Sequence, residues 1–399
     1  MHSRSLALLL LLAPVFPASA DWPNFRGPRG TGIAEDGATG PAALTEETLA
    51  WSSDLPGRGL SSPIVVGDRV FLTCSSGPLQ DRLHLICFAA ADGKKLWHRE
   101  YWATGRTMTH EKTCVAAPTP ASDGKRVFAI YSSNDVFCTD LDGNLLWTRG
   151  LTYDYPNASN SLGMASSPVV IDDTFVAQIE NDSESFAVGL DVLTGANKWK
   201  IDRPKAANWT SPVVVGPAGQ EIVALQSSKG ILGVVPSTGS EVWNYSEGAA
   251  TMASSAAFGD IIYAPSNGLT AFKAASNGAS VEQLWRQSEQ RPGTGSPLVL
   301  GDKGYVINGA GVLNAIRLKD GERLWRIRLK GPFSSSPIAT ATHLYVFSEP
   351  GIGQCVDLTG AEGVVTSEVD LKETILGTPS LSGNAVYVRS DKHLWRFGK

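Results

Sequence analysis

The sequence of 399 residues has few charged side chains. Asp, Glu, Lys and Arg make up 18% of it, below the roughly 25% of an average soluble domain. This shortage excludes a coiled coil, a long helical array and a highly charged disordered chain. Glycine and proline are plentiful instead, with 41 and 23 residues. Such a composition favours many short strands joined by tight turns.

The chain also lacks an excess of basic residues, because 34 Lys and Arg stand against 39 Asp and Glu. A mildly acidic protein of this kind is not expected to bind nucleic acid. The apolar run Leu6–Leu12 is too short for a membrane anchor, and no later segment resembles a membrane span. This run follows Arg4 and precedes Ala-Ser-Ala at 18–20. Residues 1–20 therefore predict a cleaved secretory signal, with a buried N-terminal helix as the alternative.

Cysteine is rare, and no pair has the spacing of zinc, thioredoxin-like or haem-attachment motifs. No cysteine stands directly after the cleavage signature, as it would in a lipid-anchored lipoprotein. We therefore expect a soluble protein that starts at Asp21, in the periplasm or outside the cell. An odd number leaves at least one thiol unpaired within the chain. Cys74 and Cys87 lie on apolar runs that can be neighbouring strands, so a disulfide and two buried thiols both stay open. The cysteines are Cys74, Cys87, Cys114, Cys138 and Cys355.

Sequence motifs of common enzyme classes are missing. There is no HExxH, G-x-S-x-G or P-loop, and GPRGTG at 27–32 follows no strand as a dinucleotide-binding loop would. Residues 180–184 hold three carboxylates, the oxygen ligands that calcium prefers. The spacing and the glycine of an EF-hand are absent, so we expect a solvated polar turn there. The sequence thus predicts no catalytic residue and no metal site.

A repeated motif is the strongest positive signal. A step of small residues and Pro, followed by an apolar run, recurs eight times at intervals of 40 to 55 residues. Between successive copies stands a second element, such as AADGKKLW (90–97) or KDGERLW (319–325), in which an Asp-Gly or Thr-Gly turn precedes a Trp. These dipeptides are hairpin signals. The first motif is marked by Pro63, Pro118, Pro168, Pro212, Ala256, Pro297, Pro337 and Pro379.

Each period predicts four short strands, A to D, with strand D ending at the Trp. Four strands in about 40 to 55 residues match a propeller blade. We therefore expect an all-β protein, an eight-bladed β-propeller of four-stranded antiparallel blades over residues 44–399, with an N-terminal extension at 21–43. The last copy lacks a fourth strand, and residues 44–55 can supply it, which closes the ring and removes an open sheet edge.

The recurrent tryptophans are expected to pack between blades as structural docking residues rather than to bind a cofactor. Their spacing also supports the closure, because Trp51 lies 12 residues before Pro63, as Trp285 and Trp325 do before their next markers. The docking residues are Trp51, Trp97, Trp147, Trp199, Trp243, Trp285 and Trp325.

The unit x-D-x-x-(T/D)-G-x-x-x-W followed by S-S-P resembles the pyrroloquinoline-quinone-type propeller repeat over residues 44–399. This resemblance implies one of three branches: quinone-dependent alcohol and glucose dehydrogenases, the non-catalytic propeller of the outer-membrane barrel-assembly machinery, or exported propellers without assigned activity. The sequence has no adjacent Cys-Cys pair, cap insertions or haem motif of the dehydrogenases, and no lipoprotein cysteine of the assembly factor. It is most similar to the third branch.

The resulting expectation is an exported, non-enzymatic binding or scaffolding module without a cofactor. The alternative is a pyrroloquinoline-quinone-dependent oxidoreductase that uses calcium and the channel mouth. The expected partner is an envelope or extracellular protein, or a small polar ligand at the channel mouth.

Two connections between blades are longer than the repeat requires. The intervals from Trp97 to Pro118 and from Trp147 to Pro168 are 21 residues each, against 12 or 13 elsewhere. Extra loop length on a rigid scaffold is where function is usually placed. A histidine beside a glutamate can also do acid–base work, with ordinary loop polarity as the alternative. In a propeller the connections from strand D to the next strand A lie on one face, by the central channel. The candidate residues on this face are Arg106, His110, Glu111, Lys112, Tyr153, Tyr155, Asn157, Asn160, Asn208, Trp209 and Arg291.

Overall fold

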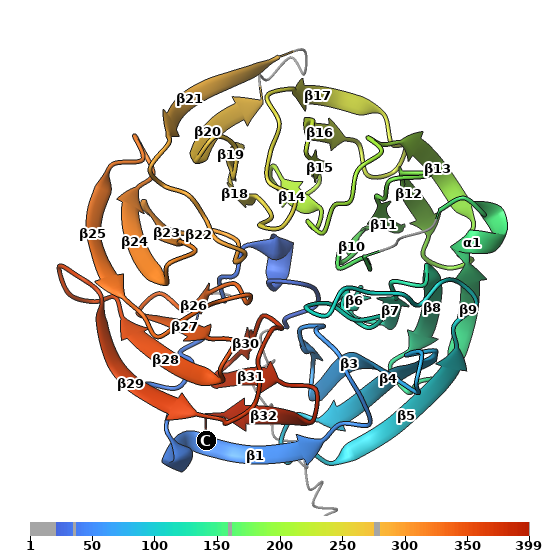
Figure 1. Cartoon of the computed structure of the whole chain (residues 1–399), viewed down its shortest axis with the longest axis horizontal. Helices are drawn as coiled ribbons and strands as arrows, with labels where there is room; N and C mark the ends of the chain where they lie inside the picture. Colours follow the sequence, from blue (N-terminus) through green and yellow to red (C-terminus); the bar gives the residue numbers. More distant parts are fainter. Residues whose placement is uncertain (1–20, 35–36, 159–161, 275–279, 399) are drawn as a thin grey trace, which may run out of the picture.

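In the computed structural model the chain forms a closed ring of eight four-stranded antiparallel sheets around a central axis (Figure 1). The structure describes residues 21–34, 37–158, 162–274 and 280–398. The predicted signal at 1–20 and the candidate residue Asn160 lie outside these ranges. The ring confirms the predicted all-β, eight-bladed propeller.

Blades 1 to 4 follow one another along the chain, each with strands A to D from the axis outward. Blade 1 comprises β2 (Ile64–Val66), β3 (Arg69–Ser76), β4 (Arg82–Ala89) and β5 (Lys95–Trp102). Blade 2 comprises β6 (Ala121–Ser122), β7 (Arg126–Ile130), β8 (Asp135–Asp140) and β9 (Leu145–Gly150). Blade 3 comprises β10 (Val169–Ile171), β11 (Thr174–Ile179), β12 (Phe186–Asp191) and β13 (Asn197–Asp202). Blade 4 comprises β14 (Val213–Val215), β15 (Ile222–Ser227), β16 (Gly230–Val234) and β17 (Glu241–Tyr245).

Blades 5 to 8 repeat this plan. Blade 5 comprises β18 (Ala256–Phe258), β19 (Ile261–Ala264), β20 (Leu269–Ala274) and β21 (Val281–Gln287). Blade 6 comprises β22 (Leu298–Leu300), β23 (Lys303–Ile307), β24 (Val312–Arg317) and β25 (Arg323–Arg328). Blade 7 comprises β26 (Ile338–Ala339), β27 (His343–Phe347), β28 (Ile352–Asp357) and β29 (Val364–Asp370). Blade 8 comprises β30 (Ser380–Ser382), β31 (Ala385–Arg389), β32 (His393–Phe397) and β1 (Leu49–Asp54).

The order of blade 8 confirms the predicted closure, because β1 pairs antiparallel with β32 and places Ser52 opposite Trp395. The expected end of strand D at the Trp is wrong. Each outer strand that carries a docking Trp begins just before it and continues beyond it, as β5 does from Lys95 to Trp102. Three short helices complete the described structure: 3-10 turns η1 (Pro28–Gly30) and η2 (Glu46–Thr48), and α1 (Leu151–Asp154). None of the helices within the described ranges is long and apolar enough to cross a membrane.

The tryptophans link each blade to the next through the repeated turn. The Trp97 indole N–H donates to the carbonyl of Leu141, 2.9 Å away, and its ring lies over Gly143. A Cβ at Gly143 would stand 2.7 Å from that ring, and its φ is +80°. The turn therefore needs glycine both for its backbone conformation and for the close approach of the Trp. The same indole-to-carbonyl bond recurs at Trp51, Trp147, Trp199 and Trp285.

The small residues of the first motif form a hydrogen-bonded chain around the axis. The backbone N–H of Ser167 donates to the Ser211 hydroxyl at 2.9 Å, and the equivalent bond joins seven of the eight blade junctions. This register corrects two marker positions. Thr119 and Ser254 carry the linking hydroxyls, so Pro120 and Ser255, not Pro118 and Ala256, precede strand A in blades 2 and 5.

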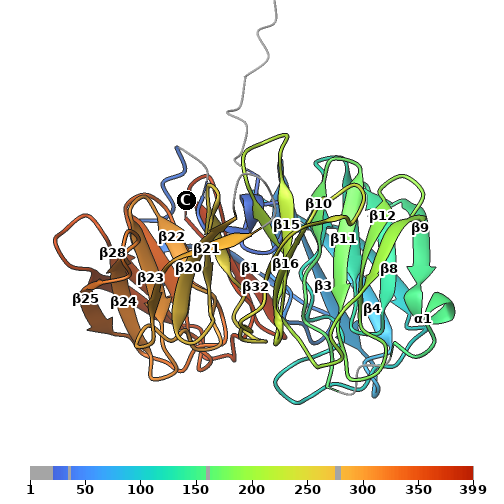
Figure 2. The same cartoon turned by 90° about the horizontal axis from the view of Figure 1, so that it is seen from above.

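The N-terminal extension crosses one face of the ring, and its short turn η1 lies near the centre (Figures 1 and 2). Trp22 pairs with Val65 of blade 1, and Ile33 forms a parallel bridge with Ala339 of blade 7. Arg26 is fully buried and donates to the carbonyls of Ser255 and Pro297 in blades 5 and 6. Burial lowers the pKa of this guanidinium to about 10. The glycine-rich segment at 27–32 thus belongs to a structural closure of the ring, not to a phosphate loop.

The five cysteines are buried and free. Although β3 and β4 are neighbours, Cys74 stands opposite His84 and Cys87 opposite Phe71. This register separates the two thiols along the sheet, so Cys74 and Cys87 form no disulfide and are two buried thiols. Burial raises the pKa of Cys87, Cys114 and Cys138 to about 12, which keeps these thiols protonated.

Candidate functional site

The two long connections lie together on the face opposite the N-terminal extension, at the bottom of Figure 2. We call the described parts of residues 103–118 and 151–168 the loop platform. The His110 N–H donates to the carbonyl of Leu162 at 2.9 Å. A Cβ at Gly163 would stand 2.9 Å from the side chains of Thr109 and Thr113. The two loops are therefore packed against each other rather than projecting separately.

The hairpin between β7 and β8 holds both loops in place. Asp135 is buried and accepts hydrogen bonds from the Thr104 N–H at 2.9 Å and from the Thr104 hydroxyl. Asn134 donates from its side chain to the Ala158 carbonyl at 2.9 Å, while its own carbonyl accepts the Leu151 N–H at 3.0 Å. One short turn thus fixes the start of each long loop.

A pocket of about 310 Å³ opens between the two loops. Arg106 is the only charged residue among those that line it. Its neighbours supply hydroxyl groups and small apolar surfaces. The lining residues are Thr104, Gly105, Arg106, Thr152, Tyr153, Pro156 and Ala158.

Four predicted site residues lie close together in the first loop. Arg106, His110, Glu111 and Lys112 are all exposed. Lys112 forms an ion pair of 3.2 Å with Glu349 of blade 7, so this loop reaches across the face. The Lys112 N–H donates to His110 Nδ1 at 3.1 Å, which orients the imidazole locally.

The remaining predicted residues do not gather at one place. Asn157 lines a second cavity of about 480 Å³, together with Arg203 and Lys205. Trp209 contacts the loop platform, because its indole N–H donates to the Gly163 carbonyl at 2.9 Å. Arg291 is exposed in the loop after β21 and donates to the Ser288 carbonyl. Of the tyrosines, Tyr153 is exposed at the pocket, whereas Tyr155 packs against Phe186.

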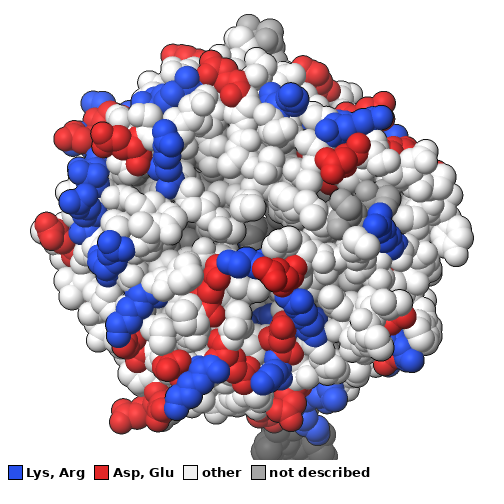
Figure 3. Space-filling model, viewed as in Figure 1, with Lys and Arg blue, Asp and Glu red and all other residues white. Residues whose placement is uncertain are grey.

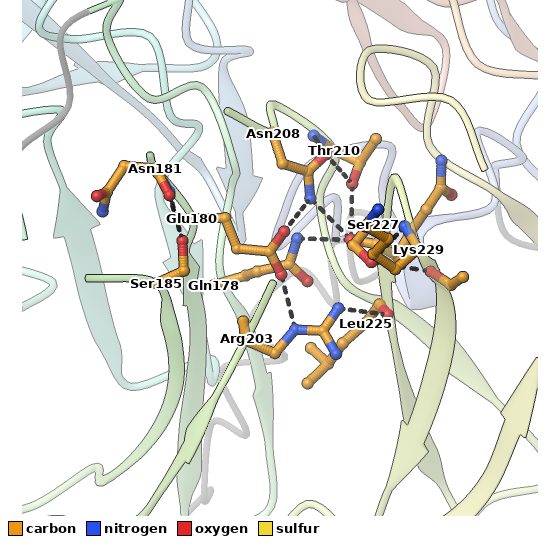
Figure 4. Close-up of polar contacts among 12 residues, drawn as sticks. Gln178, Glu180, Asn181, Ser185, Arg203, Asn208, Thr210, Leu225, Ser227 and Lys229 are labelled. Carbon is orange, nitrogen blue, oxygen red and sulfur yellow. Dashed lines mark hydrogen bonds and ion pairs between the residues drawn. The ribbon is translucent and has the colours of Figure 1, made fainter. Parts of the chain in front are cut away.

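Asn208, expected at the channel mouth, is instead buried with 2% exposure. Its amide donates to Glu180 at 3.0 Å and to the Gln226 carbonyl at 2.7 Å (Figure 4). Glu180 in turn accepts from Arg203 Nε at 2.7 Å. Burial raises the pKa of the Glu180 carboxyl, although Arg203 and Asn208 lower it. The expectation of a solvated turn is therefore wrong at Glu180, which belongs to a polar network buried between blades 3 and 4.

A histidine pair in blade 1 was not identified from the sequence. His84 Nδ1 lies 2.9 Å from His98 Nε2, and His84 Nε2 lies 2.7 Å from the Ser76 hydroxyl. Burial, followed by the charge of His98, lowers the pKa of His84 to about 4. An imidazole with this pKa is a weak base at neutral pH, so the pair does not support general-base catalysis. The antiparallel pairing of β4 with β5 creates this cluster, which residue spacing alone does not show.

The surface around the platform combines exposed apolar side chains with charges of both signs. Met108, Tyr153 and Leu162 are 54%, 79% and 38% exposed. Figure 3 shows this face, on which blue and red side chains alternate around the rim and near the centre rather than forming a patch of one sign. Such a mixture is typical of a protein-binding surface rather than of one that binds a charged polymer.

Within the described ranges no three His, Cys, Asp or Glu residues are arranged to hold a metal ion. The buried carboxylate of Glu180 already has a guanidinium 2.7 Å away, and a cation beside it would be repelled.

A family model described as outer membrane protein assembly factor BamB matches residues 42–189, 166–277 and 266–366. The chain belongs to this family. It is built of PQQ-like propeller repeats, in agreement with the blades described above. No curated sequence is similar enough to serve as a relative.

Solved structures of two kinds share the fold. BamB from Moraxella catarrhalis has a TM-score of 0.63 at 16% identity, over 88% of this chain and 97% of that one. The quinohemoprotein alcohol dehydrogenase from Comamonas testosteroni has a TM-score of 0.72 at 12% identity, over 95% and 81% of the two chains. A europium-containing methanol dehydrogenase has a TM-score of 0.70 at 12% identity, over 95% and 98%. At these identities the likeness establishes the fold and not the activity.

Proposed function

We propose that the protein is a non-enzymatic scaffold of the bacterial envelope that binds a partner protein through the loop platform. The observation that carries this proposal is the fixed position of both long loops on the hairpin of Asn134 and Asp135. A propeller does not need these loops to close its ring, and the buried polar groups that anchor them are hydrogen-bonded, so their burial is compensated and the loops keep one position. Exposed Met108 and Tyr153 then provide the apolar centre that a protein interface requires.

The cellular location of the protein is part of the same proposal. The signal-like residues 1–20 and the family described by an outer-membrane assembly factor support export to the periplasm or beyond. The mild negative charge of −5 supports a protein partner rather than a nucleic acid.

The alternative is a quinone-dependent oxidoreductase, which shares this fold. It has less support because the buried carboxylate of Glu180 is paired with Arg203. Incubation with pyrroloquinoline quinone and calcium followed by desalting separates the two functions. Retention of one quinone per chain, with reduction of a dye by alcohols or sugars, would favour the oxidoreductase.

The scaffold proposal is tested by capture of partners on immobilised protein from a native envelope extract. The platform variant carries Met108→Asp and Tyr153→Asp. The control carries Leu193→Asp and Phe258→Asp, two residues that are 65% and 52% exposed on the opposite face. We expect wild type and control to retain the same envelope protein and the platform variant to lose it. Equal retention by all three would contradict the proposal.

A further inference from the structure

The pocket between the two long loops has a floor that only one residue type permits. Gly105 lies against the hairpin of blade 2, where an added Cβ would stand 2.0 Å from the Ser133 carbonyl oxygen. Thr104 beside it is locked by Asp135, whose carboxylate also accepts a hydrogen bond from the Ser133 hydroxyl at 2.7 Å. These contacts fix the backbone at the base of Arg106. The pocket is thus present before a ligand arrives, which lowers the entropy cost of binding.

The opposite wall is equally fixed. At the start of α1 the Leu151 N–H donates to the Asn134 carbonyl. Further along the loop, the Ala158 carbonyl accepts a hydrogen bond from the Asn134 side chain. Between these two anchors stand Thr152, Tyr153 and Pro156, which line the pocket. Asn134 itself has a φ of +65°. Asparagine adopts this conformation readily in tight turns, so the hairpin can hold both anchors without strain.

The side chains that line the pocket favour an anionic ligand group with an apolar group next to it. Among the described lining residues Arg106 is the charged one, and its guanidinium also donates to Met108 Sδ at 3.2 Å. The Thr152 and Tyr153 side chains add hydroxyl donors, while Pro156 adds a flat apolar surface. A guanidinium binds a carboxylate through two parallel hydrogen bonds, a geometry that a single ammonium group cannot match.

The surroundings favour a polypeptide rather than a membrane surface. Glu111 and Lys112 follow Arg106 within six residues and are exposed, so this loop carries both signs. The net charge of the chain is −5, which opposes binding to anionic lipid. Met108 and Leu162 are exposed on the same platform. Their side chains offer contacts to residues that flank a bound carboxylate.

We propose that this pocket binds the carboxylate of an Asp or Glu side chain in an exposed segment of a partner protein, and that Arg106 is its specificity-determining residue. This inference rests on the proposed function and names the chemistry of its partner. The bound segment places the acidic side chain on Arg106 and an adjacent apolar side chain on Tyr153.

Two acetylated and amidated peptides test the proposal: fluorescein-labelled Ala-Leu-Glu-Leu-Ala and its Gln counterpart. Fluorescence anisotropy should give at least about tenfold tighter binding of the Glu peptide to wild type, as one charge-assisted pair implies. Arg106→Gln should remove this ratio. Arg291→Gln, which removes an exposed arginine of the loop between blades 5 and 6, should keep it. Equal binding of both peptides by wild type, or an unchanged ratio in Arg106→Gln, would overturn the proposal.

Two further measurements keep the outcomes distinct. Sedimentation with phosphatidylglycerol vesicles should leave wild type in the supernatant. Pelleting that Arg106→Gln abolishes would assign the pocket to a lipid headgroup and overturn the peptide proposal. The capture experiment separates this inference from the proposed function. If Arg106→Gln captures the envelope protein as wild type does, while the Met108 and Tyr153 variant loses it, the scaffold stands and the carboxylate pocket fails.

Discussion

The buried ion pair between Glu180 and Arg203 allows a prediction with a defined magnitude. Their side chains are only 1% and 5% exposed, and the Glu180 carboxylate lies 2.7 Å from Arg203 Nε. Arg203→Met leaves a buried carboxylate whose remaining side-chain donor, among the described residues, is Asn208. Removing one partner of a buried pair typically costs about 3–5 kcal/mol. Replacing both partners costs far less, because no charge stays buried.

Equilibrium unfolding in guanidinium chloride, followed by tryptophan fluorescence, measures this as a double-mutant cycle. We expect Arg203→Met to lose about 3–5 kcal/mol, and Glu180→Gln with Arg203→Met to lie within about 1 kcal/mol of wild type. A single variant as stable as wild type would show that the carboxylate is hydrated. A double variant as unstable as Arg203→Met would show that packing, not charge, dominates the site.

The pH dependence of this site has a definite sign. Because burial raises the pKa of Glu180, the folded protein binds a proton on this group at higher pH than the unfolded chain does. The contribution of Glu180 to stability therefore falls as the pH rises through the raised folded value. Glu180→Gln should remove this component from the stability profile above the ordinary glutamate pKa of about 4.3.

Three further predictions concern the scaffold. Trp285→Ala should destabilise the protein by about 3–5 kcal/mol, as for a buried aromatic, and a melting temperature within about a degree of wild type would contradict its docking role. The lowered pKa of His84, about 4, means that its contribution to stability is lost as the pH falls from 6.5 towards 4, so acid unfolding of His84→Gln should begin at lower pH; an unchanged acid profile would refute this. Removing residues 21–55 takes away β1 and the buried Arg26, and it should cause aggregation or loss of a cooperative melting transition; an unaltered transition in soluble protein would refute the closure.

Most of the fold could be predicted because the same sequence pattern recurs in successive blades. The Asp-Gly or Thr-Gly turn and the Trp recur since each blade makes the same contact with the next, as Trp97 does with Gly143. Single departures from the repeat were harder to align. A proline in another register at Pro118 and a missing proline at Ser255 shifted two markers, and only the hydroxyl chain through Thr119 and Ser254 reveals the register.

The site was predictable in outline and not in detail. Excess loop length indicated the platform and the position of Arg106. The residues that hold it, Asn134 and Asp135, look in the sequence like an ordinary turn between β7 and β8. The burial of Asn208 and Glu180 depends on Arg203 and Gln226 from other strands, which no local pattern encodes. The Arg26 closure was likewise hidden, because it depends on contacts with blades 5 and 6.

Site-specific photo-crosslinking in living cells tests most directly whether function lies on the loop platform. A photoreactive amino acid replaces Tyr153 on the platform or Leu193 on the opposite face, which are 79% and 65% exposed. We predict one discrete protein adduct from position 153, identified by mass spectrometry as an envelope protein, and none from position 193. An adduct from position 193 alone, or the same adducts from both positions, would contradict the assignment of the partner site to the long loops.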